Sequence, residues 1–304
     1  TSIIKKKIDY IMCSISGLDG LDSTINCIGI TKNIAIANKE SIICAWSIIE
    51  KQLIQCKTKF IPVDSEHFSI WSLLKNDQIN NVDNIYITAS GGPFLNYKLN
   101  KLKYVTPKEA IKHPNWNMGK KISVDSATLM NKVFEVIEAQ RIFNININKF
   151  KILVHPKSYV HAIVKFNNGL TKMLIHDTNM TIPIFNTMYF DTNVKIKTNK
   201  LNINLLNNLN FKKINLERYP VVNIIKDIPN YNSLYDTVLT SANDELVRSF
   251  LNDEIKFVDI SKFLIKLLKL KEFNKYKLKR PKNFNEIMKL SKYVRLKTHL
   301  LSVK

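Results

Sequence analysis

The 304-residue sequence predicts a protein of α/β and α+β class: an α/β region first, a mixed α+β region next and a helical region last. Three observations predict this order. Short apolar runs alternate with helical patterns near the start, a strong hairpin signal stands near the middle, and helical periodicity continues from residue 233 onward. Because 45% of the residues are hydrophobic, the chain can bury a substantial core.

The first part, residues 1–63, alternates between strand and helix patterns. Apolar runs predict strands at 10–15, 33–37 and 60–63, and the segments between them predict helices, the first ending near Gly29. This order is typical of βαβ units on a parallel sheet, here the second half of a dinucleotide-type domain. The glycine fingerprint that opens such a domain is absent, and the chain starts at Thr1. We therefore expect that the natural N-terminus is missing.

Two carboxylates follow the third predicted strand, at Asp64 and Glu66. In an extended segment, side chains at i and i+2 point the same way. Two such carboxylates repel each other unless a cation or a proton lies between them. Oxygen ligands suit a hard divalent ion such as Mg²⁺ or Mn²⁺. An Asp-x-Glu pair in a solvated loop is the simpler alternative, and Glu135 is a candidate third ligand.

A small-residue turn, Ser90-Gly91-Gly92, follows the strand predicted at 84–88. Such a turn exposes backbone N–H groups and a hydroxyl, which suit a phosphate group, although an ordinary tight turn is the alternative. Downstream, Thr106 and Glu109 form a capping box with Pro at the first helical position. A short helix is therefore expected to lead into His113.

The loop Pro114–Gly119 carries two large apolar side chains, Trp116 and Met118. Such side chains can close over a ligand and exclude water, or they can pack against the core beneath the loop. The segment Lys121–Val124 has a β-type pattern, and a helix is expected after it, with Asp125 or Ser126 as the N-cap.

The helix predicted after this loop has one polar and one apolar face. Spacings of four and three place Asn131, Glu135 and Glu138 on the polar face. The opposite face carries Leu129, Val133, Val136 and Ile137. An amide and two carboxylates beside Ser126 and Lys132 predict a site that binds a metal ion and an anion together.

The hairpin signal is Asn167-Asn168-Gly169, between strands predicted at 159–166 and 170–176, so an antiparallel sheet is expected here. The histidines of this region are expected to be hydrogen-bonded within the fold rather than to bind metal; they are His155, His161 and His176. Residues 190–215, rich in Asn, Lys and Thr, predict a linker. In the helical region, Asp259 and Asn283 are expected to be N-caps.

The net charge of +21 favours a nucleic-acid ligand at first sight. The lysines, however, are spread along the chain among Asn and Ile, as an AT-biased coding sequence would produce, and no nucleic-acid motif is visible. The four cysteines have neither zinc-site nor disulfide-framework spacing, which favours free thiols in a reducing compartment. No apolar run reaches the ~18 residues of a membrane span.

Taken together, the motifs resemble one family, the 1-deoxy-D-xylulose 5-phosphate reductoisomerases of the non-mevalonate isoprenoid pathway. The matching runs are Ala-Asn-Lys-Glu-Ser at 37–41, Pro-Val-Asp-Ser-Glu-His at 62–67, Ser-Gly-Gly-Pro-Phe at 90–94, His-Pro-Asn-Trp at 113–116, Met-Gly-Lys-Lys-Ile-Ser-Val-Asp-Ser-Ala-Thr at 118–128 and Met-Asn-Lys at 130–132. Weaker matches are His155-Pro156, His161, Met180, Pro183, Arg218-Tyr219-Pro220 and Ala242-Asn243. The resemblance runs from about residue 10 to about residue 260.

The resemblance implies an NADPH- and metal-dependent enzyme that rearranges the carbon skeleton of its substrate to an aldehyde and reduces it to 2-C-methyl-D-erythritol 4-phosphate. It implies metal ligation and catalysis by Asp64, Glu66 and Glu135, with Glu138 supporting them. It implies substrate contacts from Ser65, Ser90, His113, Trp116, Ser126, Asn131, Lys132 and Glu135, with Met118 beside Trp116 in a closing flap. It implies an NADPH side formed by Gly17, Asn38, Lys39, Glu40, Gly119 and Met180. The metal would be Mg²⁺ or Mn²⁺, with Co²⁺ as a further option.

The implied organisation is the C-terminal half of a Rossmann-like NADPH domain at 1–63, a catalytic domain at 64–189, the linker at 190–215 and a helical domain at 216–304. The partners would be a small phosphorylated sugar and a second copy of the chain, without nucleic acid or membrane, in a bacterial cytoplasm or a plastid-type organelle. The sequence departs from the family at Val133, where the family has glycine beside the metal helix and where a β-branched side chain could crowd the site. It also departs at 178–180 and at Thr240 and Asp244, where the family has Asn and Glu. A decayed, non-catalytic remnant and a basic nucleic-acid-binding protein are the alternatives.

Overall fold

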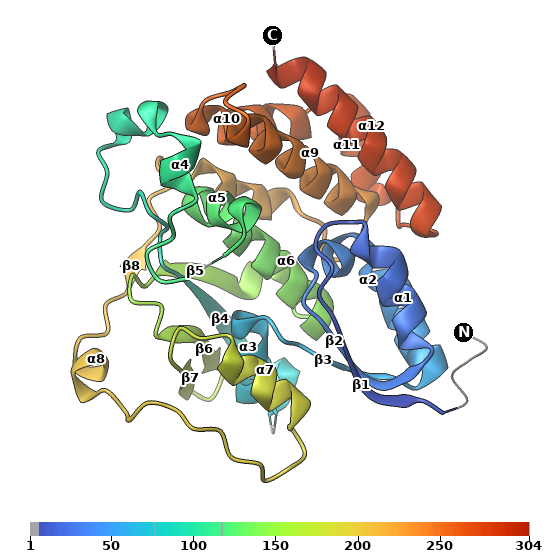
Figure 1. Ribbon diagram of the computed structural model, residues 1–304, viewed down its shortest axis with the longest axis vertical. Helices are drawn as coiled ribbons and strands as arrows, with labels where there is room; N and C mark the ends of the chain where they lie inside the picture. Colours follow the sequence, from blue (N-terminus) through green and yellow to red (C-terminus); the bar gives the residue numbers. More distant parts are fainter. Residues whose placement is uncertain (1–5, 76, 117, 304) are drawn as a thin grey trace.

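The computed structural model describes residues 6–75, 77–116 and 118–303, in which two sheets and a group of C-terminal helices are arranged around shared helices (Figure 1). The first sheet is parallel, in the order β1 (Ile8–Cys13), β2 (Thr31–Ile36), β3 (Lys59–Ile61). Helices α1 (Gly20–Ile28) and α2 (Lys39–Cys56) connect these strands. The predicted βαβ order is confirmed, and Gly29 is the C-cap of α1.

Helix α2 begins at an Asn cap and breaks in its middle. The Asn38 side chain accepts a hydrogen bond from Ser41 N at 2.8 Å, which satisfies one of the free N–H groups of the first turn. At Ala45 the backbone leaves the helical region (φ −133°, ψ 17°). The amide of Asn232 fills the break: its Nδ2 donates to Ile43 O at 2.9 Å and its Oδ1 accepts from Ser47 N at 3.2 Å.

The second sheet is mixed, in the order β7-β6-β4-β5-β8. Its strands are β4 (Val82–Ala89), β5 (Phe150–Val154), β6 (Val160–Phe166), β7 (Thr171–Ile175) and β8 (Lys212–Lys213). Strands β4 and β5 are parallel, and the other neighbours are antiparallel. The hairpin predicted around Gly169 (φ 87°) is confirmed. The antiparallel region is nevertheless part of a mixed sheet, because β4, which pairs antiparallel with β6, also pairs in parallel with β5.

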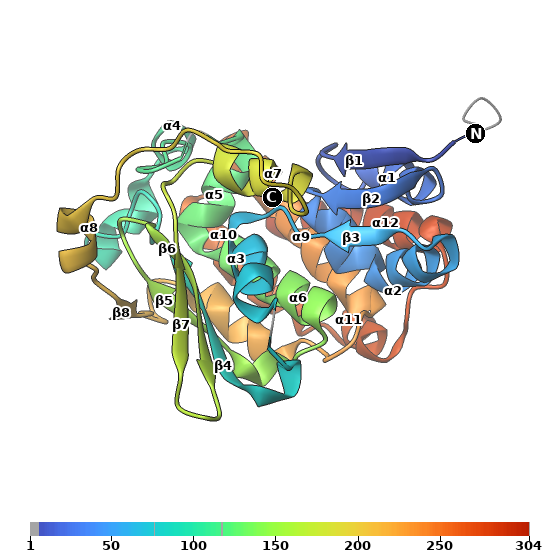
Figure 2. The ribbon, with the colours of Figure 1, turned by 90° about the horizontal axis from the view of Figure 1, so that it is seen from below.

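Helices α3 (Ser65–Leu74) and α6 (Met130–Phe143) lie between the two sheets (Figure 2). Before α6, the structure has α4 (Pro107–Ala110), with the predicted capping box at Thr106, and α5 (Lys120–Thr128). The predicted strand at 121–124 is wrong. Helix α5 begins there because Gly119 supplies the cap position, Lys121 pairs with Asp125 one turn later at 3.1 Å, and Val124 is fully buried.

The predicted cap at Asp125 or Ser126 is therefore also wrong, since both residues lie inside α5. The chain changes direction at Leu129, whose backbone is left-handed (φ 62°) and whose side chain is buried. Helix α6 starts directly after it. The apolar face predicted for this helix is buried, including Val133 at 0% exposure.

The C-terminal region is helical, and α9 lies at its centre, packed against α10, α12 and α2 (Figure 1). The remaining helices are α7 (Thr181–Met188), α8 (Ile203–Asn207), α9 (Leu234–Leu251), α10 (Phe257–Leu268), α11 (Lys271–Asn274) and α12 (Phe284–Ser302). Short 3₁₀ helices lie at Ile79–Asn81, Leu99–Tyr104, Ile147–Lys149, Pro220–Asp227 and Lys275–Leu278. In the described part of the chain, no helix is both long enough and apolar enough to span a bilayer.

Two predictions for this half need correction. The segment 190–215 is not wholly irregular, because it contains α8 and also β8, which pairs with β5. Asp259 is not the N-cap of α10: it lies three positions after Lys256, whose N–H donates to the Asp259 carboxylate at 3.2 Å. Asn283 does cap α12, accepting from Glu286 N at 3.0 Å.

Candidate active site

The carboxylates Asp64 and Glu66 lie at the start of α3, just after β3. Asp64 is the N-cap and accepts from Glu66 N at 3.1 Å, and Glu66 lies in the first helical turn. The extended geometry predicted for this pair is therefore wrong. The two side chains nevertheless line the same cavity, of about 260 Å³.

Helix α6 brings Glu135 to the same cavity. Among the described residues, one oxygen each from Asp64, Glu66 and Glu135 lie within 4.8 Å of one another. The two helices are joined next to this point, since His67 of α3 donates from Nε2 to the backbone oxygen of Glu135 at 2.8 Å. The three carboxylates come from two helices, and their convergence depends on this helix pair.

Two lysines neutralise the carboxylates. Lys132 Nζ donates to Glu66 Oε1 at 2.5 Å and to Glu135 Oε2 at 2.7 Å. Lys39 Nζ contacts Asp64, and it lies 3.3 Å from Glu138 Oε2. Glu138 thus lies behind the three carboxylates and helps to balance the charge of Lys39.

The electrostatics of the group favour a divalent cation. Burial, together with the negative charge of Glu66, raises the pKa of Glu135 well above its usual range. Burial would also raise the pKa of Asp64, but Lys39, His67 and Lys132 together outweigh it and lower that pKa. Asn131 adds a buried Oδ1 that has no hydrogen-bond partner within the described chain. Its Nδ2 donates to Glu135 Oε1 at 2.5 Å. Oxygen donors gathered with excess negative charge fit Mg²⁺ or Mn²⁺.

The hydroxyl of Ser90 is prepared to donate to an anion. His113 Nδ1 accepts from the backbone N–H groups of Asn115 at 3.1 Å and Trp116 at 3.0 Å, so Nε2 carries the proton and donates to Ser90 Oγ at 3.0 Å. Ser90 Oγ also accepts from Gly92 N at 3.1 Å. Both acceptor positions of the hydroxyl are then occupied, and its O–H is left for a ligand. Burial, with Lys132 nearby, lowers the pKa of His113 to about 4, so the ring stays neutral.

The glycines of the turn allow it to approach α5 closely. Gly92 has φ 67°, and a Cβ at this position would lie 2.8 Å from Ala127 Cα. The contact brings Ser90 next to the C-terminal part of α5. Ser126, Asn131 and Lys132 line the same cavity as Ser90 and the carboxylates. The predicted anion-binding and metal-binding residues therefore share one cavity, although the ammonium of Lys132 bridges two carboxylates in this structure.

The loop before α5 covers this cavity. Trp116 and Met118 both line it, rather than only contacting the core; Asn117 between them lies outside the described residues. The indole ring of Trp116 packs edge-on against His161, with ring centroids 6.3 Å apart. His161 in turn stacks on His176 at 3.7 Å. As expected, the histidines of the second sheet bond to backbone oxygens: His155 to Asn210 at 2.9 Å, His161 to His176 at 3.3 Å and His176 to Asp177 at 2.7 Å.

A second cavity, of about 450 Å³, adjoins the first and shares Lys39, Ile122 and Asn131 with it. Four of the residues expected on the cofactor side line it: Asn38, Lys39, Glu40 and Gly119. Lys39 also lines the first cavity, and Met180 lines only the first, on the side of the carboxylates. Gly17 lines neither, but its carbonyl accepts from Asn38 Nδ2 at 2.7 Å and so holds the cap of α2.

Several lining residues were not singled out from the sequence. In the first cavity these are Thr88 and Ser158, and in the second Ser14, Ser16 and Lys121. Ser158 has a positive φ of 51° after His155-Pro156, a backbone strain that no residue pattern announces. Val133 is buried in the core and does not line either cavity, so the expected crowding of the site does not occur.

Comparison with known proteins gives consistent results. Family models match three segments: 1-deoxy-D-xylulose 5-phosphate reductoisomerase at residues 1–46, its C-terminal domain at 60–143, and the DXP reductoisomerase C-terminal domain at 176–297. The 1-deoxy-D-xylulose 5-phosphate reductoisomerase of Pelagibacter ubique is 60% identical over 98% of this chain and 76% of its own length. The enzyme of Clostridium novyi is 35% identical over 95% of this chain and 74% of its own length.

Solved structures agree with the sequence comparison. The reductoisomerase of Zymomonas mobilis in complex with NADPH superposes with a TM-score of 0.85 at 32% identity, covering 96% of this chain and 75% of that one. A DOX-P reductoisomerase in complex with NADPH, fosmidomycin and magnesium has a TM-score of 0.89 at 27% identity, covering 97% and 76%.

Proposed function

Because this chain belongs to the 1-deoxy-D-xylulose 5-phosphate reductoisomerase family, we propose that it converts 1-deoxy-D-xylulose 5-phosphate to 2-C-methyl-D-erythritol 4-phosphate. The reaction uses NADPH and a divalent metal ion, as the complexes of related enzymes with NADPH and magnesium suggest. The observation that carries the proposal is the convergence of Asp64, Glu66 and Glu135 in the cavity that also contains Ser90.

The three carboxylates hold the metal ion, and Glu138 balances the charge of Lys39 behind them. When bound, the ion stabilises oxyanion charge on the hydroxyketone during the rearrangement. Lys39 helps to keep Asp64 ionised, and a bound cation would stabilise the ionised form of Glu135, whose pKa burial raises. Ser65, whose hydroxyl donates to Glu66 Oε2 at 2.6 Å, orients that ligand and faces the substrate.

The substrate phosphate lies against the Ser90 turn and the neighbouring ends of α5 and α6. Ser90 donates its free O–H, and Ser126, Asn131 and Lys132 supply further polar groups from the same cavity. His113 holds the Ser90 hydroxyl in place as a neutral donor. Binding of a phosphate away from the reacting carbons positions the substrate through remote binding energy.

The flap residues Trp116 and Met118 exclude water from the aldehyde stage of the reaction. NADPH supplies the hydride for the reduction. It lies along the second cavity, against Asn38, Glu40 and Gly119, with Met180 and Lys39 toward the substrate. Gly17 contributes indirectly, because its carbonyl oxygen accepts a hydrogen bond from the Asn38 side chain that caps α2. The substrate is a small phosphorylated sugar, and the active species is a homodimer with the four-part organisation expected from the sequence.

The test is an assay of the full-length protein that follows NADPH absorbance with 1-deoxy-D-xylulose 5-phosphate and identifies the product. Oxidation of NADPH is expected with Mg²⁺ or Mn²⁺, and it should stop when EDTA removes the metal ion. If no metal-dependent oxidation occurs in protein that binds NADPH, the proposed activity is wrong and the chain is a non-catalytic remnant.

A further inference from the structure

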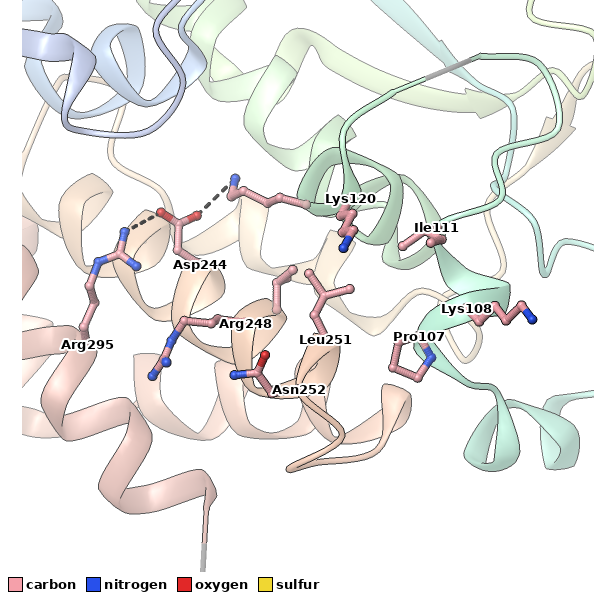
Figure 3. A pocket seen from close by; sticks show the side chains of 11 residues that line it. Pro107, Lys108, Ile111, Lys120, Asp244, Arg248, Leu251, Asn252 and Arg295 are labelled. Atoms are coloured by element: carbon pink, nitrogen blue, oxygen red, sulfur yellow. Dashed lines mark hydrogen bonds and ion pairs between the residues drawn. The ribbon is translucent and has the colours of Figure 1, made fainter.

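The departure from the family at Asp244 lies beside a third cavity, of about 470 Å³, between α4, α5, α9 and α12 (Figure 3). Asp244 belongs to α9 and Arg295 to α12, and their side chains point toward each other at this cavity (Figure 3). Arg295 Nη2 donates to Asp244 Oδ2 at 2.7 Å. The other carboxylate oxygen, Oδ1, lies 3.0 Å from Lys121 Nζ of α5.

Lys121 continues this chain of contacts into the second cavity. Its Nζ donates to Glu40 Oε1 at 3.0 Å and to Asp125 Oδ2 at 3.1 Å. Asp125 is held on its far side by Asn243 Nδ2 at 2.7 Å. The groups Arg295, Asp244, Lys121 and Glu40 thus form one connected path from α12 through α9 and α5 to the start of α2.

The balance of charge in this path explains why Arg295 matters. Three carboxylates surround the Lys121 ammonium, and their residues are nearly buried: Asp125 is 2% exposed, Glu40 7% and Asp244 9%. One ammonium cannot neutralise three buried carboxylates. Arg295 supplies the second positive charge on the side of Asp244. Without it, Asp244 would attract Lys121 more strongly, at the expense of Glu40.

We propose that Arg295 and Asp244 are positioning residues for the cofactor, because they hold Lys121 so that Lys121 fixes Glu40 in the wall of the second cavity. The inference rests on the proposed function, which places NADPH at this wall. It makes α12, the last helix, a determinant of NADPH affinity. Asp244 has a shorter side chain than the Glu of the family, and it forms an ion pair with Arg295 from the neighbouring helix α12.

The test compares NADPH binding to the full-length wild-type protein and to Arg295→Gln, by fluorescence titration without metal or substrate. We expect the dissociation constant for NADPH to rise about fivefold or more. In turnover assays the KM for NADPH should rise similarly, while the KM for the sugar phosphate and kcat stay near the wild-type values. Arg295→Lys keeps the positive charge and should bind NADPH nearly as tightly as the wild type.

Arg248→Gln is the matched control. Arg248 lines the same cavity (Figure 3), but it pairs with Glu245, and among the described residues no hydrogen bond or ion pair joins its side chain to the path described above. This variant should bind NADPH like the wild type. If Arg295→Gln binds like the wild type, or if Arg248→Gln and Arg295→Lys weaken binding as much as Arg295→Gln does, the inference is overturned.

A double-mutant cycle with Glu40→Gln separates this inference from the proposed function. If Arg295 acts through Glu40, the two substitutions are expected to be strongly non-additive. Additive effects overturn the inference but leave the proposed function intact. The same holds if Arg295→Gln weakens NADPH binding while Glu40→Gln does not. Failure of the wild-type protein to bind NADPH would instead overturn the proposed function.

Discussion

At the scale of single residues, the anion-binding part of the site depends on one neutral histidine. Because backbone N–H groups occupy His113 Nδ1, its Nε2 must donate to Ser90, and a protonated ring would lose both of the contacts at Nδ1. Burial lowers the pKa of His113 to about 4, so the ring should remain neutral across the physiological range. Substrate binding through Ser90 then uses the neutral ring with its proton on Nε2, and it needs no second proton on His113.

We therefore expect that the His113 imidazole does not titrate between pH 8 and pH 5.5 in the ligand-free protein. The chemical shifts of the imidazole protons can be followed by NMR as the pH changes, and the His113 resonances can be assigned by their absence in His113→Asn. Inorganic phosphate should raise the pKa of His113, since a nearby negative charge stabilises the imidazolium. A midpoint near 6.5 without phosphate would contradict the burial of the ring and the role assigned to it.

The close approach of the Ser90 turn to α5 gives a second prediction. Gly92→Ala places a methyl group 2.8 Å from Ala127 Cα at a positive φ. We expect a loss of about 2 kcal/mol or more in unfolding free energy, measured by denaturant titration, and a raised KM for the sugar phosphate. Gly29→Ala is the control, because its Cβ would lie no closer than 3.9 Å to any other atom and its φ is negative. Equal stability of the two variants would contradict the account of the turn.

The chemistry of individual residues could be predicted from the sequence better than their geometry. Asp64 and Glu66 were expected near a cation because two close carboxylates repel, but they lie at the N-cap and in the first turn of α3 and not in an extended segment. Lys39 was expected on the cofactor side. The structure places its ammonium among the carboxylates, because these buried groups require a nearby positive charge. Such compensation across distant segments has no signal in a single stretch of sequence.

At the scale of elements, a side chain from a distant part of the sequence fills the break in α2 at Ala45. Asn232 bridges the break and also donates to Asp236 Oδ2 at 3.0 Å. Both carboxylate oxygens of Asp236 accept from Nη2 of Arg141 in α6, each at 3.0 Å. One buried chain of polar groups therefore links α2 and α6, the two helices that carry Lys39 and Glu135.

Asn232→Ala should leave the backbone groups of Ile43 and Ser47 buried without partners. The expected loss is about 2–4 kcal/mol in unfolding free energy, measured by denaturant titration. Asn208→Ala, which removes an exposed amide at the end of α8, should change it by no more than about 0.5 kcal/mol. A small effect of Asn232→Ala would mean that the break in α2 is not held by this side chain.

Most elements could be predicted because their signals are local: the βαβ order, the Gly169 turn and the caps at Thr106 and Asn283. The exception is the segment 120–129. Its β-branched residues favour a strand, but burial of Val124 and the left-handed backbone at Leu129 give two helices that meet at an angle. In this segment tertiary packing overrides the local preference for a strand, and the pattern of residue types along the sequence does not reveal that packing.

At the scale of the whole molecule, the site lies between the two sheets, and residues positioned by both sheets line it. The first sheet positions α2, the second sheet positions Ser90, and α3 and α6 between them carry the carboxylates (Figure 2). The sequence predicts the order of these regions along the chain, but it does not predict how they pack against one another. The mixed sheet joins β4 to strands some seventy residues later, which local patterns do not reveal.

The net charge of +21 concerns the molecule as a whole, and it gives a prediction against the nucleic-acid alternative. If the many lysines result only from an AT-biased coding sequence, the protein should not bind DNA or RNA specifically at physiological salt. Fluorescence anisotropy across a range of salt concentrations measures this. Binding tighter than about 10⁻⁶ M at physiological salt, with a steep salt dependence, would favour the alternative function.

The most direct test of the metal site is Glu135→Gln in the full-length protein. The substitution preserves the shape of the side chain and removes one of the three charges that converge in the cavity. With the fold intact by circular dichroism, we predict that Mn²⁺ affinity falls and that metal-dependent NADPH oxidation is lost. Unchanged Mn²⁺ binding and unchanged turnover in this variant would contradict the assignment of Asp64, Glu66 and Glu135 as the metal centre.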